Sequence, residues 1–174
     1  MTADQHFIDT CRYYVAKEYL PKIRRCLEAL TEDDVWWRPN PDSNSVGNLV
    51  LHLSGNIRQW IVSGVGGRPD IRERAREFAA DGETQGAEWD KARLLAHLAA
   101  TLAEVDETLA ELKPEELLRR TTIQGQDVTV LEGVFHAVEH FSMHTGQIIY
   151  VTKLRTGTDL RFYDVQDGIA TRNW

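Results

Sequence analysis

Three histidines near the C-terminal end of the sequence recur at intervals of four residues: His136, His140 and His144. Side chains four residues apart lie on one row of a helix, and two imidazoles at this spacing can reach a single metal ion. Two ligands hold an ion weakly, so a third protein ligand is needed. His52, in the middle of a separate predicted helix, is the obvious candidate. The spacing therefore predicts a divalent-metal site that joins two helices.

The position of each histidine around its helix selects two of the three. At about 100° per residue, His144 lies roughly 100° from the centre of the apolar stripe, His140 about 140° and His136 close to 180°. His144 and His140 therefore lie on the shoulder of the stripe, whereas His136 is expected to point away. His52 lies about 120° from the centre of its own stripe. The predicted ligands are His52, His140 and His144.

Two other interpretations of these histidines stay open. Residues 136–140 read HxxEH, the inverted zinc-protease signature, in which Glu139 would be the general base. That reading would place a ligand, His136, on the outermost row of the helix. Alternatively, the histidines are unrelated polar residues at the edges of amphipathic helices. A di-iron site is disfavoured, because it needs Glu-x-x-His pairs and no Glu here precedes a His by three residues.

Polar side chains beside the predicted ligands could fix the imidazole tautomers by hydrogen bonding. The candidates are Asn48, Asn56, Glu139 and Gln147. Glu139 could instead be a solvated charge on the helix face. The sequence assigns no catalytic residue, and it contains neither a Gly-rich phosphate loop nor a GxSxG nucleophile elbow.

Four long segments with helical periodicity must position these histidines. They cover residues 3–30, about 44–63, 88–112 and 130–154. Pro21 lacks an N–H and is expected to kink or divide the first helix. Ser43 or Asn44 is the expected N-cap of the second helix. Cys11 and Cys26 lie roughly 22 Å apart along the first helix, so we expect two free core cysteines rather than a disulfide.

The connections between these helices define the predicted fold. Residues 64–86 form a long, charged link in which a helical turn is expected at 71–78. Such a link suits a crossover, so the second and third helices are expected to run parallel. Residues 121–128 predict a small hairpin or an extended loop, and the polar tail after Arg155 is expected to pack along the surface. The prediction is an all-α, four-helix bundle that forms a single domain over residues 1–174.

Composition excludes several classes of function. The 174 residues carry 20 basic and 27 acidic side chains, a formal charge of −7. This balance argues against a nucleic-acid-binding protein, which needs a basic face. No apolar stretch approaches the ~20 residues of a membrane span, and the N-terminus lacks a hydrophobic signal core. We expect a cytoplasmic protein that interacts with neither nucleic acid nor membrane.

Two segments resemble the signatures of the DinB-like metalloproteins. Residues 44–56, NSVGNLVLHLSGN, are similar to the first signature, and residues 138–148, VEHFSMHTGQI, are similar to the second. The resemblance extends from the first helix to about Arg155. It implies a bundle in up-down-down-up order and one divalent ion, usually zinc or nickel, bound by His52, His140 and His144. It also implies a homodimer, because members often form one.

The same resemblance implies two classes of function. Several family members resemble or are thiol S-transferases that use mycothiol or bacillithiol, and one branch isomerises maleylpyruvate with a thiol cofactor. A three-histidine ion with an open position could serve a thiol transferase or a hydrolase that acts on a small molecule. The alternative is a non-enzymatic, stress-associated bundle in which the ion ties two helices together. The sequence does not identify the substrate.

Overall fold

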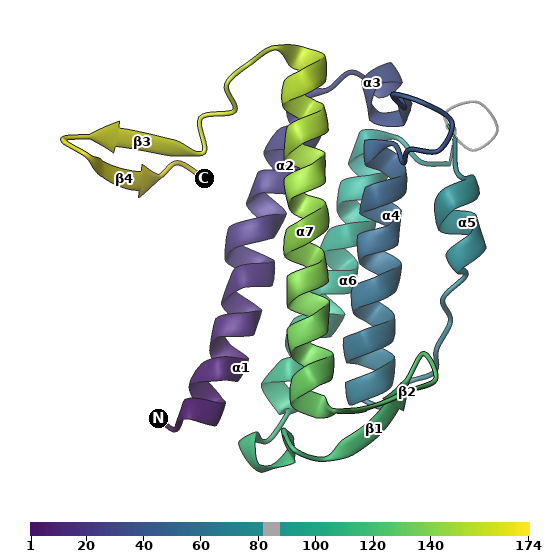
Figure 1. Cartoon of the computed structure of the whole chain (residues 1–174), viewed down its shortest axis with the longest axis vertical. Helices are drawn as coiled ribbons and strands as arrows, with labels where there is room; N and C mark the ends of the chain where they lie inside the picture. The colour runs from purple at the N-terminus through teal and green to yellow at the C-terminus, as the bar shows by residue number, and fades with distance from the viewer. Residues whose placement is uncertain (82–87) are drawn as a thin grey trace.

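Four helical rods form the bundle in a computed structural model that describes residues 1–81 and 88–174 (Figure 1). The first rod comprises α1 (Ala3–Tyr13), the π-helical segment η1 (Tyr14–Tyr19) and α2 (Leu20–Ala29), and the second comprises α4 (Val46–Ile57) and the π-helical η2 (Arg58–Val65). The third rod is α6 (Lys91–Glu111) and the fourth is α7 (Val130–Thr156). Figure 1 shows the rods running up, down, down and up, which confirms the predicted all-α fold.

Pro21 divides the first rod as predicted. It lies in the first turn of α2, directly after the π-helical segment η1. Pro21 has no N–H to donate to the carbonyl of Lys17, four residues earlier. That carbonyl instead accepts a hydrogen bond from the indole Nε1 of Trp174 at 2.8 Å. The change from π-helix to α-helix at this point thus coincides with an anchor for the C-terminal end of the chain.

The link between α4 and α6 is the predicted crossover. It leaves η2 at the lower end of the bundle and returns along the outside of α4 to the upper end, so α4 and α6 run parallel (Figure 1). The expected helical turn is α5 (Arg74–Ala79). Residues 82–86 of the predicted link lie outside the described residues. The crossover places α5 against α4, on the flank that carries His52.

Side-chain caps fix where the short and long helices begin. Thr31 caps α3 (Glu32–Trp36), and Asp34 completes the reciprocal capping box. The N-cap of α4 is Ser45, not Ser43 or Asn44 as expected. Ser45 pairs with Asn48 in a capping box, because the Asn48 amide oxygen takes the role that Glu or Gln usually has at the third helical position.

A two-stranded hairpin precedes α7. Of the two predicted alternatives, a hairpin or an extended loop, the structure has the hairpin. It follows the short 3₁₀ turn η3 (Pro114–Glu116) and pairs β1 (Arg120–Ile123) with β2 (Gln126–Thr129). Gln124 and Gly125 both have positive φ, which gives the tight turn the twist that the strands require. Ile123 is buried and attaches this hairpin to the end of the second rod.

The C-terminal tail does not simply pack along the surface, and that expectation is corrected. After Gly157 ends α7 with a positive φ, β3 (Tyr163–Gln166) and β4 (Ile169–Arg172) form a hairpin that projects from the bundle (Figure 1). The two-residue Asp-Gly loop at 167–168 is a strong hairpin signal that the sequence analysis missed. The tail is anchored at both ends, because Leu160 and Phe162 are buried at its base and the indole of Trp174 donates to the Lys17 carbonyl at 2.8 Å.

The core lies between the four rods and contains the apolar stripes that the sequence predicted. Its largest fully buried members include Ile8, Leu53, Leu98, Phe141 and Ile148. Each such side chain contributes about 1.5–3 kcal/mol by leaving water. Both cysteines are free and buried, as expected. Within residues 1–81 and 88–174, none of the helices combines the length and the apolar character that crossing a membrane requires.

Candidate metal centre

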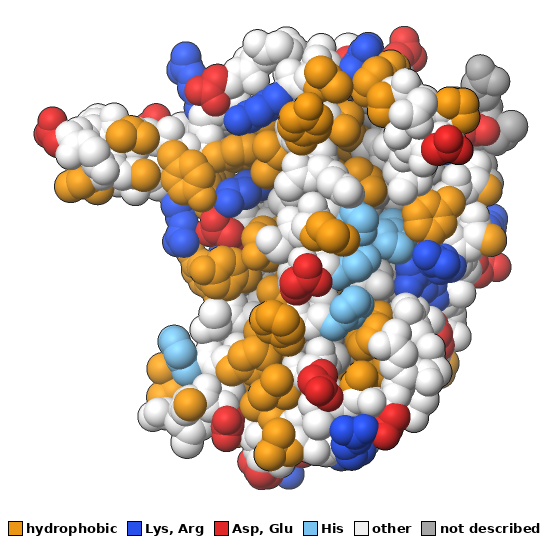
Figure 2. Space-filling model, in the orientation of Figure 1, with side chains coloured by type: hydrophobic (Ala, Val, Ile, Leu, Met, Phe, Trp, Pro, Cys, Tyr) orange, Lys and Arg blue, Asp and Glu red, His pale blue; other side chains and the backbone are white. Residues whose placement is uncertain are grey.

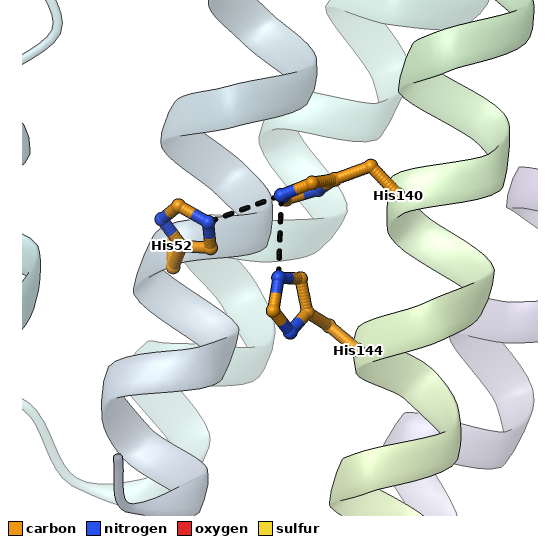
Figure 3. Close-up of side chains that lie close together, drawn as sticks. All are labelled: His52, His140 and His144. Atoms are coloured by element: carbon orange, nitrogen blue, oxygen red, sulfur yellow. Dashed lines mark hydrogen bonds between the residues drawn. The ribbon is translucent and has the colours of Figure 1, made fainter. Parts of the chain in front are cut away.

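Three imidazoles from two rods point toward one another (Figure 3). His52 is on α4, and His140 and His144 are one turn apart on α7. Nε2 of His140 lies 3.2 Å from Nε2 of His52 and 3.2 Å from Nε2 of His144. One ligand atom from each residue can be chosen so that all three lie within 4.8 Å of one another. The structure therefore brings together the three histidines selected from the sequence.

These separations suit coordination of one cation. Zinc–nitrogen bonds of about 2.0–2.1 Å place two cis ligands roughly 2.9–3.4 Å apart in octahedral or tetrahedral geometry. The observed 3.2 Å lies inside that range. A three-histidine group of this kind can hold a metal ion.

The proton positions at the site also favour a cation. Nδ1 of His52 lies 2.9 Å from a carboxylate oxygen of Glu77, and Nδ1 of His144 lies 2.6 Å from the amide oxygen of Gln147. A terminal nitrogen of Arg72 also lies 3.1 Å from Nδ1 of His52, but the carboxylate is the closer partner and Arg72 is already bound to it. Each Nδ1 is therefore assigned the ring proton and each Nε2 a lone pair. His140 Nε2 can donate at most one proton to these two lone pairs. A metal ion satisfies all three nitrogens together.

The Glu77 carboxylate that contacts His52 is itself held by an arginine of the crossover. Arg72 donates from Nε to Glu77 Oε1 at 2.7 Å and from a terminal nitrogen to Oε2 at 2.8 Å. Both side chains are almost fully buried, with 4% exposure for Arg72 and 8% for Glu77. Burial raises the pKa of Glu77, but the hydrogen bonds from Arg72 and His52 outweigh it and hold the pKa below its ordinary value. Glu77 is therefore an anion at neutral pH.

Sequence reasoning missed Glu77 and Arg72. Both belong to the charged link, where Glu73 and Arg76 form a similar but exposed pair. No local pattern distinguishes the two pairs, because only the packing of α5 against α4 buries one of them. The only sequence signal was the glycine at position 55 of the helix, where a Cβ would overlap the Glu77 carboxylate.

The surroundings of His140 and His144 keep these two imidazoles neutral. Burial, reinforced by the nearby His144 and His52, lowers the pKa of His140 to about 3. Burial also lowers the pKa of His144, although the hydrogen bond with Gln147 opposes this shift. Neutral imidazole is the form that binds metal, so few protons compete for these nitrogens at pH 7.

His136 does not point away from neighbouring elements as the helical wheel predicted. Its ring lies half-buried against the indole of Trp60, with 4.1 Å between the centroids. The wheel considered only the stripe of α7 itself, whereas η2 extends the second rod along the same face. The metal-compatible group found among the described residues contains His140 with His52 and His144, and His136 is not part of it. This arrangement does not match the HxxEH interpretation.

The four predicted supporting residues have different surroundings. Gln147 contacts His144, as described above. Asn48 instead donates to the carbonyls of Glu77 and Ala80, at 3.0 and 2.8 Å, and so fixes the end of α5. Asn56 is buried, and its Oδ1 has no hydrogen-bond partner within the described parts of the chain. Glu139 is exposed on α7.

The centre lies at the surface rather than inside the core. Figure 2 shows histidine side chains gathered on one face between α7 and α4, with hydrophobic and basic side chains beside them. His52 is buried, whereas His140 and His144 are half-buried. The ring of Phe78 lies 4.9 Å from that of His52 and forms an apolar wall. The three-histidine group is therefore partly exposed to solvent on this face.

Known proteins resemble this chain in sequence family and in fold. The model of a family described as "Protein of unknown function (DUF1572)" matches residues 3–168. A DinB-like protein from Bacillus cereus ATCC 10987 has 16% identity and a TM-score of 0.66, over 88% of this chain and 93% of that one. A conserved protein from Enterococcus faecalis has 20% identity and a TM-score of 0.65, over 91% and 99%. No curated protein matches the sequence. The fold is DinB-like.

Proposed function

This chain belongs to the DUF1572 family of proteins of unknown function, and we propose that it is a metal-dependent enzyme that acts on a small molecule. The observation that carries the proposal is the convergence of three Nε2 atoms on a face that solvent can reach. The proposed ligands are His52, His140 and His144. Zinc or nickel is the expected ion, because both accept neutral imidazole nitrogen.

The residues around the ligands would prepare them for the ion. Glu77 and Gln147 hold the Nδ1 protons of His52 and His144, which directs both Nε2 lone pairs to one point. Arg72 keeps the Glu77 carboxylate in place and ionised. When bound, a divalent ion supplies a Lewis acid that lowers the pKa of a coordinated water or thiol.

Three neutral ligands favour catalysis over a purely structural role. Structural zinc sites normally have four protein ligands, whereas catalytic sites have three and leave a position for substrate. We propose a low-molecular-weight thiol as the nucleophile, which makes the protein a thiol S-transferase toward an electrophilic small molecule. Water in place of the thiol would make it a hydrolase. Phe78 would exclude water from one side of the reacting molecule.

We also propose that the protein works as a homodimer. Large apolar side chains are exposed along one side of α7, among them Phe135, Met143, Tyr150 and Leu154. A second copy would cover apolar surface that water otherwise contacts.

The alternative function is a non-enzymatic metal-binding bundle. Two observations favour it. Glu139, the carboxylate that the sequence offers as a general base, is exposed, and Glu77 is already paired with Arg72 and His52. In this role the ion would only tie α4 to α7.

A screen with a chelator control separates the two functions. Purified protein would be assayed for metal by elemental analysis, then incubated with low-molecular-weight thiols and electrophilic acceptors, with and without chelator. Thiol conjugation or hydrolysis that chelator abolishes and added zinc or nickel restores supports the enzyme. A metal-loaded protein that neither conjugates nor hydrolyses any acceptor supports the alternative.

A further inference from the structure

A second concave site lies on the other flank of the crossover from the three histidines. It is a cavity of about 220 Å³ between α4, the crossover and α6. Arg72 and Glu77 form the wall between the cavity and the metal centre. Both residues line the cavity, and Glu77 also contacts His52. Its lining includes Leu51, Gly55, Ile71, Trp89, His97 and Thr101.

Most charges around this cavity already have partners. The lining carboxylate of Asp70 accepts hydrogen bonds from the side-chain amide of Gln59 at 2.6 Å and from the backbone N–H of Arg72 at 3.0 Å, and Glu88 is exposed to solvent. Arg58 lies 3.3 Å from Glu104, and Arg76 lies 2.7 Å from Glu73. Arg72 is bound to Glu77 as described above. Partial burial lowers the pKa of His97, so its ring is neutral at pH 7. A neutral occupant fits this lining better than an ion, because the arginines there are paired with carboxylates and Asp70 is already hydrogen-bonded.

Size and ring chemistry indicate the kind of molecule. A cavity of roughly 150 Å³ accepts benzene, so this one suits a molecule of one or two rings. Trp89 and His97 meet edge to face at the mouth, with 5.1 Å between the ring centroids. Such a pair offers both an edge and a face to a third ring. Leu51 and Ile71 supply the apolar contacts.

The wall between the two sites links their occupancy. Glu77 Oε1 lies beside Gly55 on the cavity side, while Oε2 contacts Nδ1 of His52 on the metal side. Arg72 binds both oxygens at once. A molecule packed against this wall holds the carboxylate where His52 needs it.

We propose that this cavity binds a neutral, indole-sized aromatic molecule and that its occupancy strengthens metal binding through Arg72 and Glu77. The cavity itself is independent of the proposed function, whereas the coupling depends on the metal site. Since coupling is reciprocal, the metal strengthens binding of the aromatic molecule by the same factor.

Indole is a suitable probe for the cavity in the metal-free full-length protein. Its binding would be measured by NMR titration for the wild type, Trp89→Leu and Trp37→Leu. Trp37 is the matched control, because it is also half-exposed but lies under Arg155 at another place on the bundle. We expect Trp89→Leu to weaken indole binding about tenfold and Trp37→Leu to leave it unchanged. Absence of indole binding, or equal binding by all three proteins, would overturn the cavity proposal.

The coupling is tested by zinc affinity. A competing fluorescent chelator would give the zinc dissociation constant with and without saturating indole, for the wild type and for Glu77→Gln. We expect indole to tighten zinc binding about fivefold in the wild type. The variant should show no such change. Equal zinc affinity with and without indole in the wild type would refute the coupling. A wild type that binds no zinc refutes the proposed function as well, while the indole titration still decides the cavity.

Discussion

Glu77 Oε2 lies 2.9 Å from Nδ1 of His52, and the two residues come from different elements, α5 and α4. Through this contact, a residue of the crossover supports one of the three candidate metal ligands. It orients the ring of His52 and assigns its proton to the nitrogen that faces away from His140. The first prediction concerns this carboxylate.

Replacement of Glu77 by Gln should weaken zinc binding by about 10–100-fold. Glutamine has one uncharged oxygen in place of two charged ones, so Arg72 and His52 would compete for it and the ring of His52 would lose its fixed orientation. The measurement is zinc affinity by chelator competition. Glu73→Gln is the matched control, since Glu73 lies on the same segment but pairs with exposed Arg76. Equal zinc affinity in the two variants would show that the Glu77–His52 contact does not support metal binding.

The closeness of Gly55 to Glu77 gives a second prediction. An added Cβ at Gly55 would overlap the Glu77 carboxylate. Gly55→Ala should therefore displace the carboxylate from His52 and lower zinc affinity, although alanine favours the helix. Gly146→Ala is the control, because nothing lies within 4 Å of a Cβ on that α7 residue. The control should instead gain roughly 0.5–1 kcal/mol of stability. Unchanged zinc affinity in Gly55→Ala would contradict the proposed wall.

The pairing of His140 with His144 rather than with His136 gives a third prediction. His144→Ala should lose most of the bound metal, because His144 supplies one of the three Nε2 atoms. His136→Ala should retain metal, since its ring packs on Trp60 outside the group. Elemental analysis of the purified variants measures this directly. Equal metal loss in both would mean that the wrong pair was chosen.

A fourth prediction concerns stability and pH at the end of the bundle. Asp34 accepts hydrogen bonds from Thr31 at 2.8 Å and from Arg155 at 2.7 Å, and these two partners lower its pKa. A carboxyl with a lowered folded-state pKa stabilises the fold above its unfolded pKa of about 3.9 and loses that effect as pH falls through the folded pKa. Asp34→Asn should therefore cost about 0.5–1 kcal/mol at pH 7, and this cost should shrink toward pH 3.

Chemical denaturation at several pH values would measure the effect of Asp34→Asn. Asp33→Asn is the control on the same turn of α3. The account of Asp34 fails if the two variants lose the same stability at pH 7, or if the loss from Asp34→Asn does not change with pH.

Most of the fold was predictable because each long helix carries its own apolar period. Pro21 marked the division of the first rod into helical segments, and Gly125 marked the turn of the first hairpin, which was one of two predicted alternatives. Proline and glycine give such signals because they act through local backbone geometry. The second hairpin had an equally local signal in its Asp-Gly turn, which was overlooked. The cap of α4 was misplaced because Asn48, an unusual capping-box residue, completes it.

The site was predictable only as far as single helices determine it. His140 and His144 follow from one helical row, and His52 follows from the need for a third ligand. The partner of His52 could not be found in this way, because Glu77 reaches it only after the crossover folds back on α4. The prediction that His136 points away was wrong for the same reason, because its ring packs against Trp60 on another rod.

X-ray absorption spectroscopy of the protein loaded with one equivalent of zinc tests the central claim most directly. Three imidazole ligands predict nitrogen or oxygen scatterers at about 2.0–2.1 Å, with the outer-shell pattern of three histidine rings. His52→Ala should reduce that pattern to two rings. A wild-type spectrum with fewer than three imidazoles, or one that His52→Ala leaves unchanged, would contradict the three-histidine centre.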